Sequence, residues 1–119
     1  MVSIPSILLK RLYVANSLKN EGTSFVFQLQ NQIATGTVTG LSQLAVDGQP
    51  CALDGVMISA GSEALPAPDL SAAPLTFAVG SRVTVRVPGA LPAGEHAIEI
   101  TVQTLEAGAL TISVADQLS

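Results

Sequence analysis

Hydrophobic and polar residues alternate with a period of two along several stretches of the chain. The clearest of these stretches are 24–30, 82–87, 95–104 and 110–114. In the first of them, Phe25, Phe27 and Leu29 share one face, while Gln28 lies on the other. Because successive side chains of a β-strand point to opposite faces of the sheet, this spacing predicts strands with one buried face.

Weaker segments also predict strands, and turn signals separate them. These segments are 7–15, 34–39, 42–46 and 55–60. One predicted turn covers 46–49, and another at 106–108 joins the last two strands of the clear pattern. About eight strands with turn signals roughly every 8 to 12 residues leave no room for crossover helices. We therefore expect one all-β domain over 1–119, an antiparallel β-sandwich of immunoglobulin-like or jelly-roll-like type.

One stretch, 61–74, lacks a regular pattern and carries three prolines. Because proline cannot donate a hydrogen bond to a strand ladder, this stretch predicts a loop or a covering flap. Leu65, Pro66 and Asp69 in this loop are candidate residues for binding a ligand or a partner. Removal of the loop is expected to weaken a complex without unfolding the domain.

The low share of charged residues predicts association with another protein. Hydrophobic residues make up 48% of the chain and charged residues only 12%, about half the charged share usual in soluble domains. So small a sandwich exposes much of its surface, and a surface poor in charge favours burial of apolar area against a neighbour. We expect a homo-oligomer, or a hetero-oligomer with an enzyme subunit.

Charge and aromatic content weigh against several other partners. A net charge of −4 repels phosphate backbones, so nucleic acid is not expected as a ligand. Aromatic residues are only 3% of the chain, which disfavours a stacking platform for bases or sugars. No apolar run approaches the ~20 residues of a membrane span, and the short run before Lys10 and Arg11 reverses the order of a signal peptide. We expect a cytoplasmic protein that does not bind membranes.

His96 is the single histidine of the chain and the one candidate catalytic residue. A metal site or a nucleophile–base pair built on histidine therefore has at most one member available, and we expect neither a metal nor a cofactor. The period of two places His96 on the face of Ile98 and Ile100. This position favours a polar side chain that bonds backbone at the rim of the core, as a tyrosine does in immunoglobulin-like folds.

The remaining candidate residues are rings and one thiol. Phe25 and Phe27 share the inward face, which leaves Tyr13 and Phe77 as candidate exposed rings for a ligand or partner. Cys51 has no second cysteine to pair with and lies in an apolar stretch, so we interpret it as a small buried hydrophobic residue.

Several segments, taken in order, carry a resemblance to a known family. They are LKN at 18–20, the stretch 22–31 with Phe25 and Phe27, VDG at 46–48, FAVGSRVTV at 77–85 and GALPAGEH at 89–96. Together they resemble the small β subunit of bacterial C-glycoside deglycosidases and its relatives. The resemblance implies a non-catalytic sandwich that binds a larger, metal-dependent, sugar-processing subunit. The chain departs from that pattern at 103–108, where QTLEAG replaces an arginine- and tyrosine-bearing tail.

Three functional hypotheses follow. The first is a non-catalytic subunit that joins itself or an enzyme partner through apolar surface. The second is a small enzyme that uses His96 with Glu95 and a loop aspartate. Only one of these groups titrates near neutral pH, which leaves little capacity for acid–base catalysis. The third is a module that binds a small molecule or a carbohydrate, which the few rings and donors disfavour.

Overall fold

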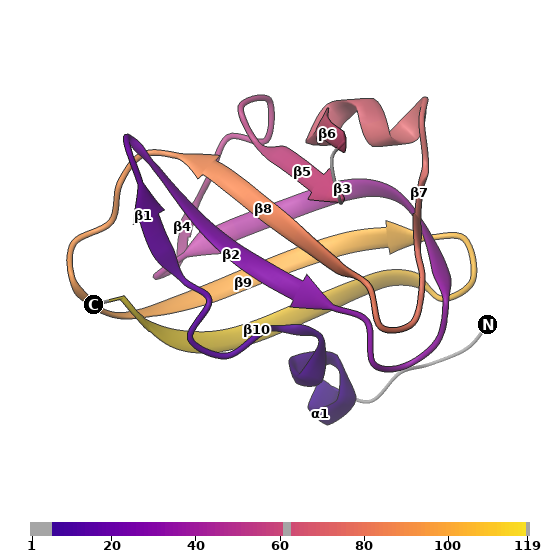
Figure 1. Ribbon diagram of the computed structural model, residues 1–119, viewed down its shortest axis with the longest axis horizontal. Helices are drawn as coiled ribbons and strands as arrows, with labels where there is room; N and C mark the ends of the chain where they lie inside the picture. The colour runs from indigo at the N-terminus through magenta and orange to yellow at the C-terminus, as the bar shows by residue number, and fades with distance from the viewer. Residues whose placement is uncertain (1–5, 61–62, 119) are drawn as a thin grey trace.

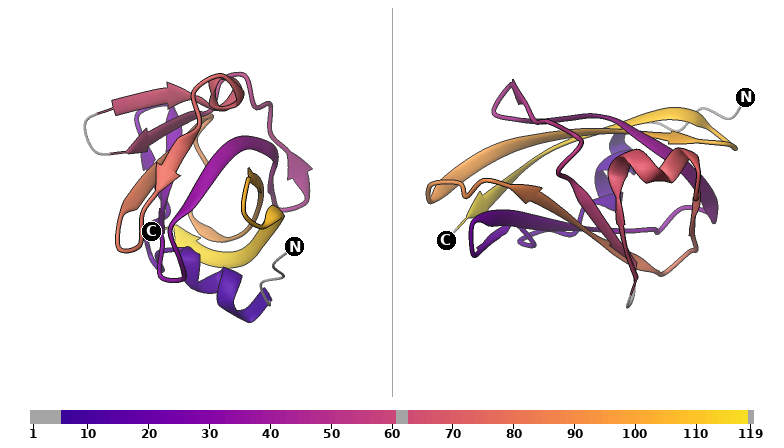
Figure 2. Two further views of the ribbon diagram at one scale, coloured as in Figure 1. Left: turned by 90° about the vertical axis from the view of Figure 1, so that its right-hand side faces the viewer. Right: turned by 90° about the horizontal axis from the view of Figure 1, so that it is seen from above.

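Two antiparallel sheets pack face to face in the computed structural model, which describes residues 6–60 and 63–118 (Figure 1). The first sheet has the order β1 (Lys19–Glu21), β2 (Ser24–Gln30), β8 (Arg82–Pro88), β5 (Met57–Ala60) and β6 (Glu63–Pro66). The second has the order β10 (Gly108–Leu118), β9 (Gly94–Thr104), β3 (Gly36–Val46) and β4 (Gln49–Pro50), and β7 (Leu75–Phe77) pairs with β3. Figure 2 shows the two layers from the end and from above. The predicted β-sandwich is confirmed, with ten strands described in place of about eight.

The strands with clear alternation are confirmed, and their apolar faces form the core. β2, β8, β9 and β10 cover the four stretches with the clear pattern. Phe27 of β2 and Leu44 of β3 are completely buried between the sheets. Each fully buried side chain of this size contributes about 1.5–3 kcal/mol through the removal of apolar surface from water.

The predicted turns are confirmed by their backbone angles. Asp47 and Gly48, between β3 and β4, both have positive φ, 54° and 80°, and Val46 pairs with Gln49. Two central residues with positive φ define a type I′ turn, whose twist matches that of the strands it joins. Gly108, the first residue of β10 directly after the β9–β10 turn, also has a positive φ of 67°.

The prediction of a strand over 7–15 is wrong. The segment forms a short helix α1 (Ser6–Leu9) and a 3-10 helix η1 (Lys10–Leu12), after which Tyr13 makes one isolated bridge to Leu29. Leu9, Leu12 and Tyr13 are buried, and their spacing of three and four residues is helical. The apolar run is too short to establish a period, so a strand and a helix were not distinguishable.

Two further segments differ from expectation. The stretches 34–39 and 42–46 belong to one strand, β3, whose register against β9 shifts after Val38 and again after Leu41. The stretch 61–74 is more regular than predicted, because it contains β6 and a 3-10 helix η2 (Ala67–Ser71), while residues 61–62 lie outside the described part. β6 is an edge strand that ends at Pro66, and edges tolerate a residue without an N–H.

In the described part of the chain, no helix has the length and apolar character needed to cross a membrane.

Candidate ligand-binding cavity

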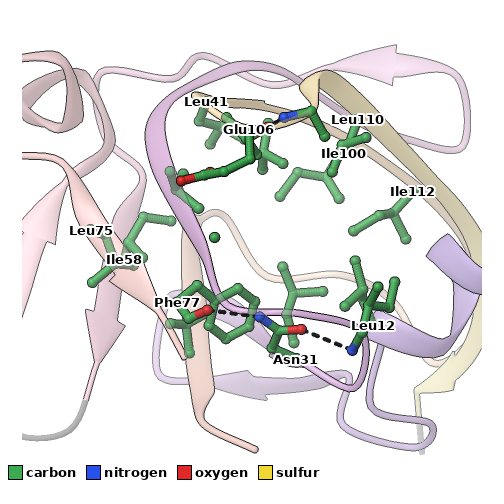
Figure 3. Close-up of a pocket in the computed structure, with 18 of the residues that line it drawn as sticks. Leu12, Asn31, Leu41, Ile58, Leu75, Phe77, Ile100, Glu106, Leu110 and Ile112 are labelled. Carbon is green, nitrogen blue, oxygen red and sulfur yellow. Dashed lines mark hydrogen bonds between the residues drawn. The ribbon is translucent and has the colours of Figure 1, made fainter. Parts of the chain in front are cut away.

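A cavity of about 400 Å³ lies between the two sheets at the end marked by the β9–β10 turn (Figure 3). Its walls come from both sheets, with Ile58 and Val83 on one side and Val38, Val102 and Leu110 on the other. The labelled side chains in Figure 3 surround a common space and are mainly aliphatic. The cavity is therefore a continuation of the hydrophobic core rather than a polar cleft.

The cavity exists because the core is incompletely filled toward this end. Along the inner face of β9, Ile98 and Ile100 are 1% and 2% exposed, whereas Val102 is only half-buried. Leu75 and Phe77 of β7 face the same space and are also half-buried. The apolar lining thus continues toward the β9–β10 turn with side chains that are less completely buried. The left view of Figure 2 faces this end of the sandwich.

Asn31 organises the loops on one side of the cavity. Its Nδ2 donates to the carbonyls of Ala34 (2.8 Å) and Phe77 (2.7 Å), and its Oδ1 accepts from the N–H of Ile33 (3.0 Å). These bonds tie the end of β2 to the segment before β3 and to the end of β7. Sequence reasoning missed Asn31; the available signal was an asparagine directly after a strand, where its side chain commonly bonds nearby backbone.

Glu106, an exposed residue of the β9–β10 turn, lines another side of the cavity. Its carboxylate accepts hydrogen bonds from the Thr37 N–H (2.7 Å) and the Thr37 hydroxyl (2.9 Å), and Leu105 N–H donates to the Thr37 carbonyl (3.1 Å). The β9–β10 turn is thereby joined to the start of β3. The hydrogen bonds from Thr37 lower the pKa of Glu106, which keeps the carboxylate ionised. The sequence placed Glu106 only in a turn and did not predict this role.

The N-terminal segment supplies a further part of the wall through Leu12. Asp116 of β10 holds this segment in place by accepting from the Tyr13 hydroxyl (2.6 Å), Leu18 N–H (3.1 Å) and Asn16 N–H (3.2 Å). Burial by itself would raise the pKa of Asp116, but the hydrogen bonds from Tyr13 and the backbone outweigh it and lower that pKa. Tyr13, expected as an exposed ring, is buried.

His96 lies near the opposite end of β9 and does not line the cavity. Its Nδ1 is 2.6 Å from Asp47 Oδ2 and its Nε2 is 2.7 Å from the Pro92 carbonyl oxygen. Both partners are acceptors, so both contacts are hydrogen bonds only when both ring nitrogens carry protons, as in an imidazolium. The bond to Asp47, followed by the bond to Pro92, raises the pKa of His96, and His96 in turn lowers the pKa of Asp47. The expected position at the rim of the core, bonded to backbone, is confirmed.

The other predicted site residues do not converge on one place. Phe77 is half-buried and lines the cavity, whereas Leu65 lines a second, smaller cavity of about 190 Å³. Pro66 is half-buried at the end of β6, and Asp69 is exposed in η2. Within 6–60 and 63–118, no three histidine, cysteine, aspartate or glutamate side chains are grouped as a metal site would require.

Cys51, expected as a buried residue, is half-buried against the edge of the core. Burial raises the pKa of its thiol. A thiol with a raised pKa is a weaker nucleophile at neutral pH than an exposed one, because less of it is present as thiolate.

The fold and the cavity define a β-sandwich domain with an apolar cavity at one end. The family model for the hydroxymethylglutaryl-CoA reductase N-terminal domain matches residues 8–119, and the chain belongs to this family. A comparison with curated proteins found no match.

The family match overturns the resemblance to the C-glycoside deglycosidase subunit. The segments behind that resemblance are strand-and-turn signatures. VDG at 46–48, for example, enters the type I′ turn between β3 and β4. Any antiparallel sandwich with a tight hairpin needs residues of this type, so such segments do not distinguish one family from another.

Proposed function

We propose that this domain is a non-catalytic binding module that holds an apolar ligand between its sheets. The observation that supports the proposal is the cavity of about 400 Å³ with its aliphatic lining. Binding sites for small molecules have volumes of roughly 300–1,000 Å³ and are lined mainly by hydrophobic side chains. The third hypothesis from the sequence, a small-molecule module, is therefore favoured in an apolar rather than a carbohydrate-binding form.

The distribution of ionisable groups supports a non-catalytic role. His96 is bonded to Asp47, Asp116 is bonded to the N-terminal segment, and Glu21 is paired with Arg86 and Lys19. These groups lie on separate elements and hold the fold together. Membership of a family named for the N-terminal domain of a reductase fits a module that works beside a catalytic part, and we assign any such chemistry to that part.

Titration with the neutral fluorescent dye N-phenyl-1-naphthylamine tests this proposal. We expect saturable binding to the wild-type protein. Val102→Phe places a ring in the cavity from β9 and should weaken dye binding at least tenfold without lowering the melting temperature, because the added ring fills space that is already empty.

The matched control is Val114→Phe in β10, which changes another half-buried valine that does not line the cavity. This variant should keep the dye affinity of the wild-type protein, provided that circular dichroism shows it folded. Absence of saturable dye binding to the folded wild-type protein, or equal affinity in the Val102→Phe variant, contradicts the proposal.

Association with another protein is a second candidate function. Among the residues that the structure describes, three large hydrophobic side chains are well exposed: Ile7 (70%), Val79 (57%) and Leu105 (72%). Leu105 lies in the β9–β10 turn next to Glu106, and Val79 lies in the turn whose Gly80 N–H donates to the Asn31 carbonyl. Two of the three exposed side chains therefore belong to turns at the cavity end. This placement supports the interpretation that apolar side chains around the cavity form a surface to which a partner protein binds.

A further inference from the structure

The lining of the cavity contains one ionised group and no cation among the described residues. That group is the Glu106 carboxylate, held by the backbone and hydroxyl of Thr37 at the β9–β10 turn. No lysine, arginine or histidine belongs to the described lining. A ligand carboxylate or phosphate in this cavity would thus meet a like charge and no partner of opposite charge.

Two polar side chains that line the cavity, Asn31 and Thr104, are already bonded within the protein. Asn31 uses both its amide hydrogens and its carbonyl oxygen on backbone groups. The Thr104 hydroxyl donates to the Gly108 carbonyl and accepts from the Ala107 N–H. Throughout the described residues, no buried side-chain nitrogen or oxygen lacks a hydrogen-bond partner. The cavity therefore offers mainly hydrocarbon contacts, and these polar side chains already have partners within the protein.

We infer that the cavity takes an uncharged molecule with an aliphatic chain, such as a fatty alcohol or its ester, and discriminates against the carboxylate of the same chain length. The inference rests on the proposed function and adds the chemical class of the ligand. An ion buried without a partner loses its hydration without compensation. Repulsion by Glu106 acts in the same direction, while an uncharged hydroxyl loses much less hydration energy than a carboxylate and is not repelled.

The chain of the ligand supplies the affinity in this arrangement. Each methylene transferred from water to an apolar site should strengthen binding about fourfold, the factor that corresponds to ~0.8 kcal/mol. The increase should stop at the chain length that fills the cavity. A plateau in affinity along a homologous series therefore reports the capacity of the cavity.

Displacement of N-phenyl-1-naphthylamine by matched alcohols and carboxylates tests the inference. We use 1-octanol and 1-decanol against octanoate and decanoate at pH 7.5 and low salt, each below the concentration at which it self-associates. The alcohols should displace the dye at concentrations at least tenfold lower than the carboxylates of equal length. Decanol should bind more tightly than octanol.

The variant Glu106→Gln identifies the source of the discrimination. A glutamine can accept from the Thr37 N–H and donate to the Thr37 hydroxyl, so both contacts of Glu106 have a replacement. Decanoate affinity should rise roughly threefold, as expected for removal of a unit charge about 6 Å away in water, with decanol unchanged. The control is Glu99→Gln, the same change on β9 outside the cavity lining, where the carboxylate accepts from Ser113; it should leave both affinities unchanged.

The outcomes separate the two proposals. If dye and alcohol bind in the cavity but the carboxylate binds equally or more tightly, the inferred ligand class is wrong and the proposed binding function stands. If the discrimination persists unchanged in the Glu106→Gln variant, the role assigned to Glu106 is wrong. If neither dye nor alcohol binds to the folded protein, the proposed function itself fails.

Discussion

Buried polar side chains in this domain connect segments that are far apart in the sequence. Asp116 near the C-terminus holds Tyr13 and Leu18, and His96 of β9 holds Asp47 of the β3–β4 turn. Each of these groups would be costly to bury alone, because an unpaired polar group loses its bonds to water. Their pairing explains why ionisable residues that look like candidate chemistry in the sequence have structural roles.

The His96–Asp47 pair predicts a pH dependence of stability. The pKa of His96 is raised in the folded protein, so the folded state binds the proton more tightly than the unfolded state. The resulting stabilisation is fully present below pH 6.5, the ordinary value for histidine, and is lost as the pH rises through the raised value. The melting temperature should therefore fall across this window, as measured by circular dichroism in buffers of constant ionic strength.

Two variants test the origin of that pH dependence. The melting temperature of the His96→Gln variant should depend less on pH over the same window, because the variant has no titrating ring. Glu95→Gln changes the exposed neighbouring residue on β9 and should keep the wild-type dependence. A wild-type slope that survives in the His96→Gln variant would show that another group is responsible.

The residue-scale predictions from sequence succeeded where a local pattern was sufficient. The parity of β9 placed His96 on the buried face with Ile98 and Ile100, and the structure confirms it. The partner of His96 could not be predicted, because Asp47 is 49 positions away and is brought close only by the pairing of β3 with β9. For the same reason, the partners of Asp116 and Glu106 could not be predicted from the sequence.

At the scale of elements, the stretch 61–74, predicted as a loop whose removal leaves the domain folded, differs most from expectation in its segment 67–71. Ala67 and Leu70 are buried, and the Ala67 N–H donates to the Val56 carbonyl (2.8 Å). η2 packs against β3, and Leu70 belongs to the walls of both cavities. Ala67 and Leu70 belong to the hydrophobic core, so removal of this segment should unfold the domain.

Leu70→Ala tests the structural role of η2. The substitution removes a side chain that is almost fully buried, and we expect the free energy of unfolding to fall by about 2–5 kcal/mol in urea titrations. The matched control is Leu105→Ala, where the side chain is mostly exposed and the expected change is within about 0.5 kcal/mol. Equal effects of the two substitutions would contradict this view of η2.

The sequence predicted long alternating strands more successfully than short elements. β2, β8, β9 and β10 have seven or more residues each, which is enough for a period of two to be distinguished from other patterns. β1 and β7 have three residues each and were not predicted. Such short strands are set by their partners β2 and β3 rather than by their own composition.

At the scale of the whole molecule, the scarcity of charge predicts self-association through the apolar surface near the cavity. Light scattering after size-exclusion chromatography should show a mass above 12.1 kDa that increases with protein concentration. The double variant Val79→Ser and Leu105→Ser should shift the protein toward the monomer. Neither side chain is buried, so the melting temperature should change little.

The control for this experiment is Thr111→Ser together with Ser113→Thr on β10, which changes exposed residues without altering apolar surface at the cavity end. This variant should associate as the wild-type protein does. A strictly monomeric wild-type protein at all concentrations tested would rule out self-association and leave a different protein as the partner to be sought.

The sequence by itself determined the fold class, the principal strands, the tight turns and the inward face that carries His96. These features depend on neighbouring residues, because a period of two and a turn residue act within a few positions. Tertiary structure alone decided the helical N-terminal segment, the partners of Asp47, Asp116 and Glu106, and the cavity. A cavity is the volume that the side chains of two facing sheets leave unfilled, and the sequence of one strand does not indicate how far its inner face lies from the opposite sheet.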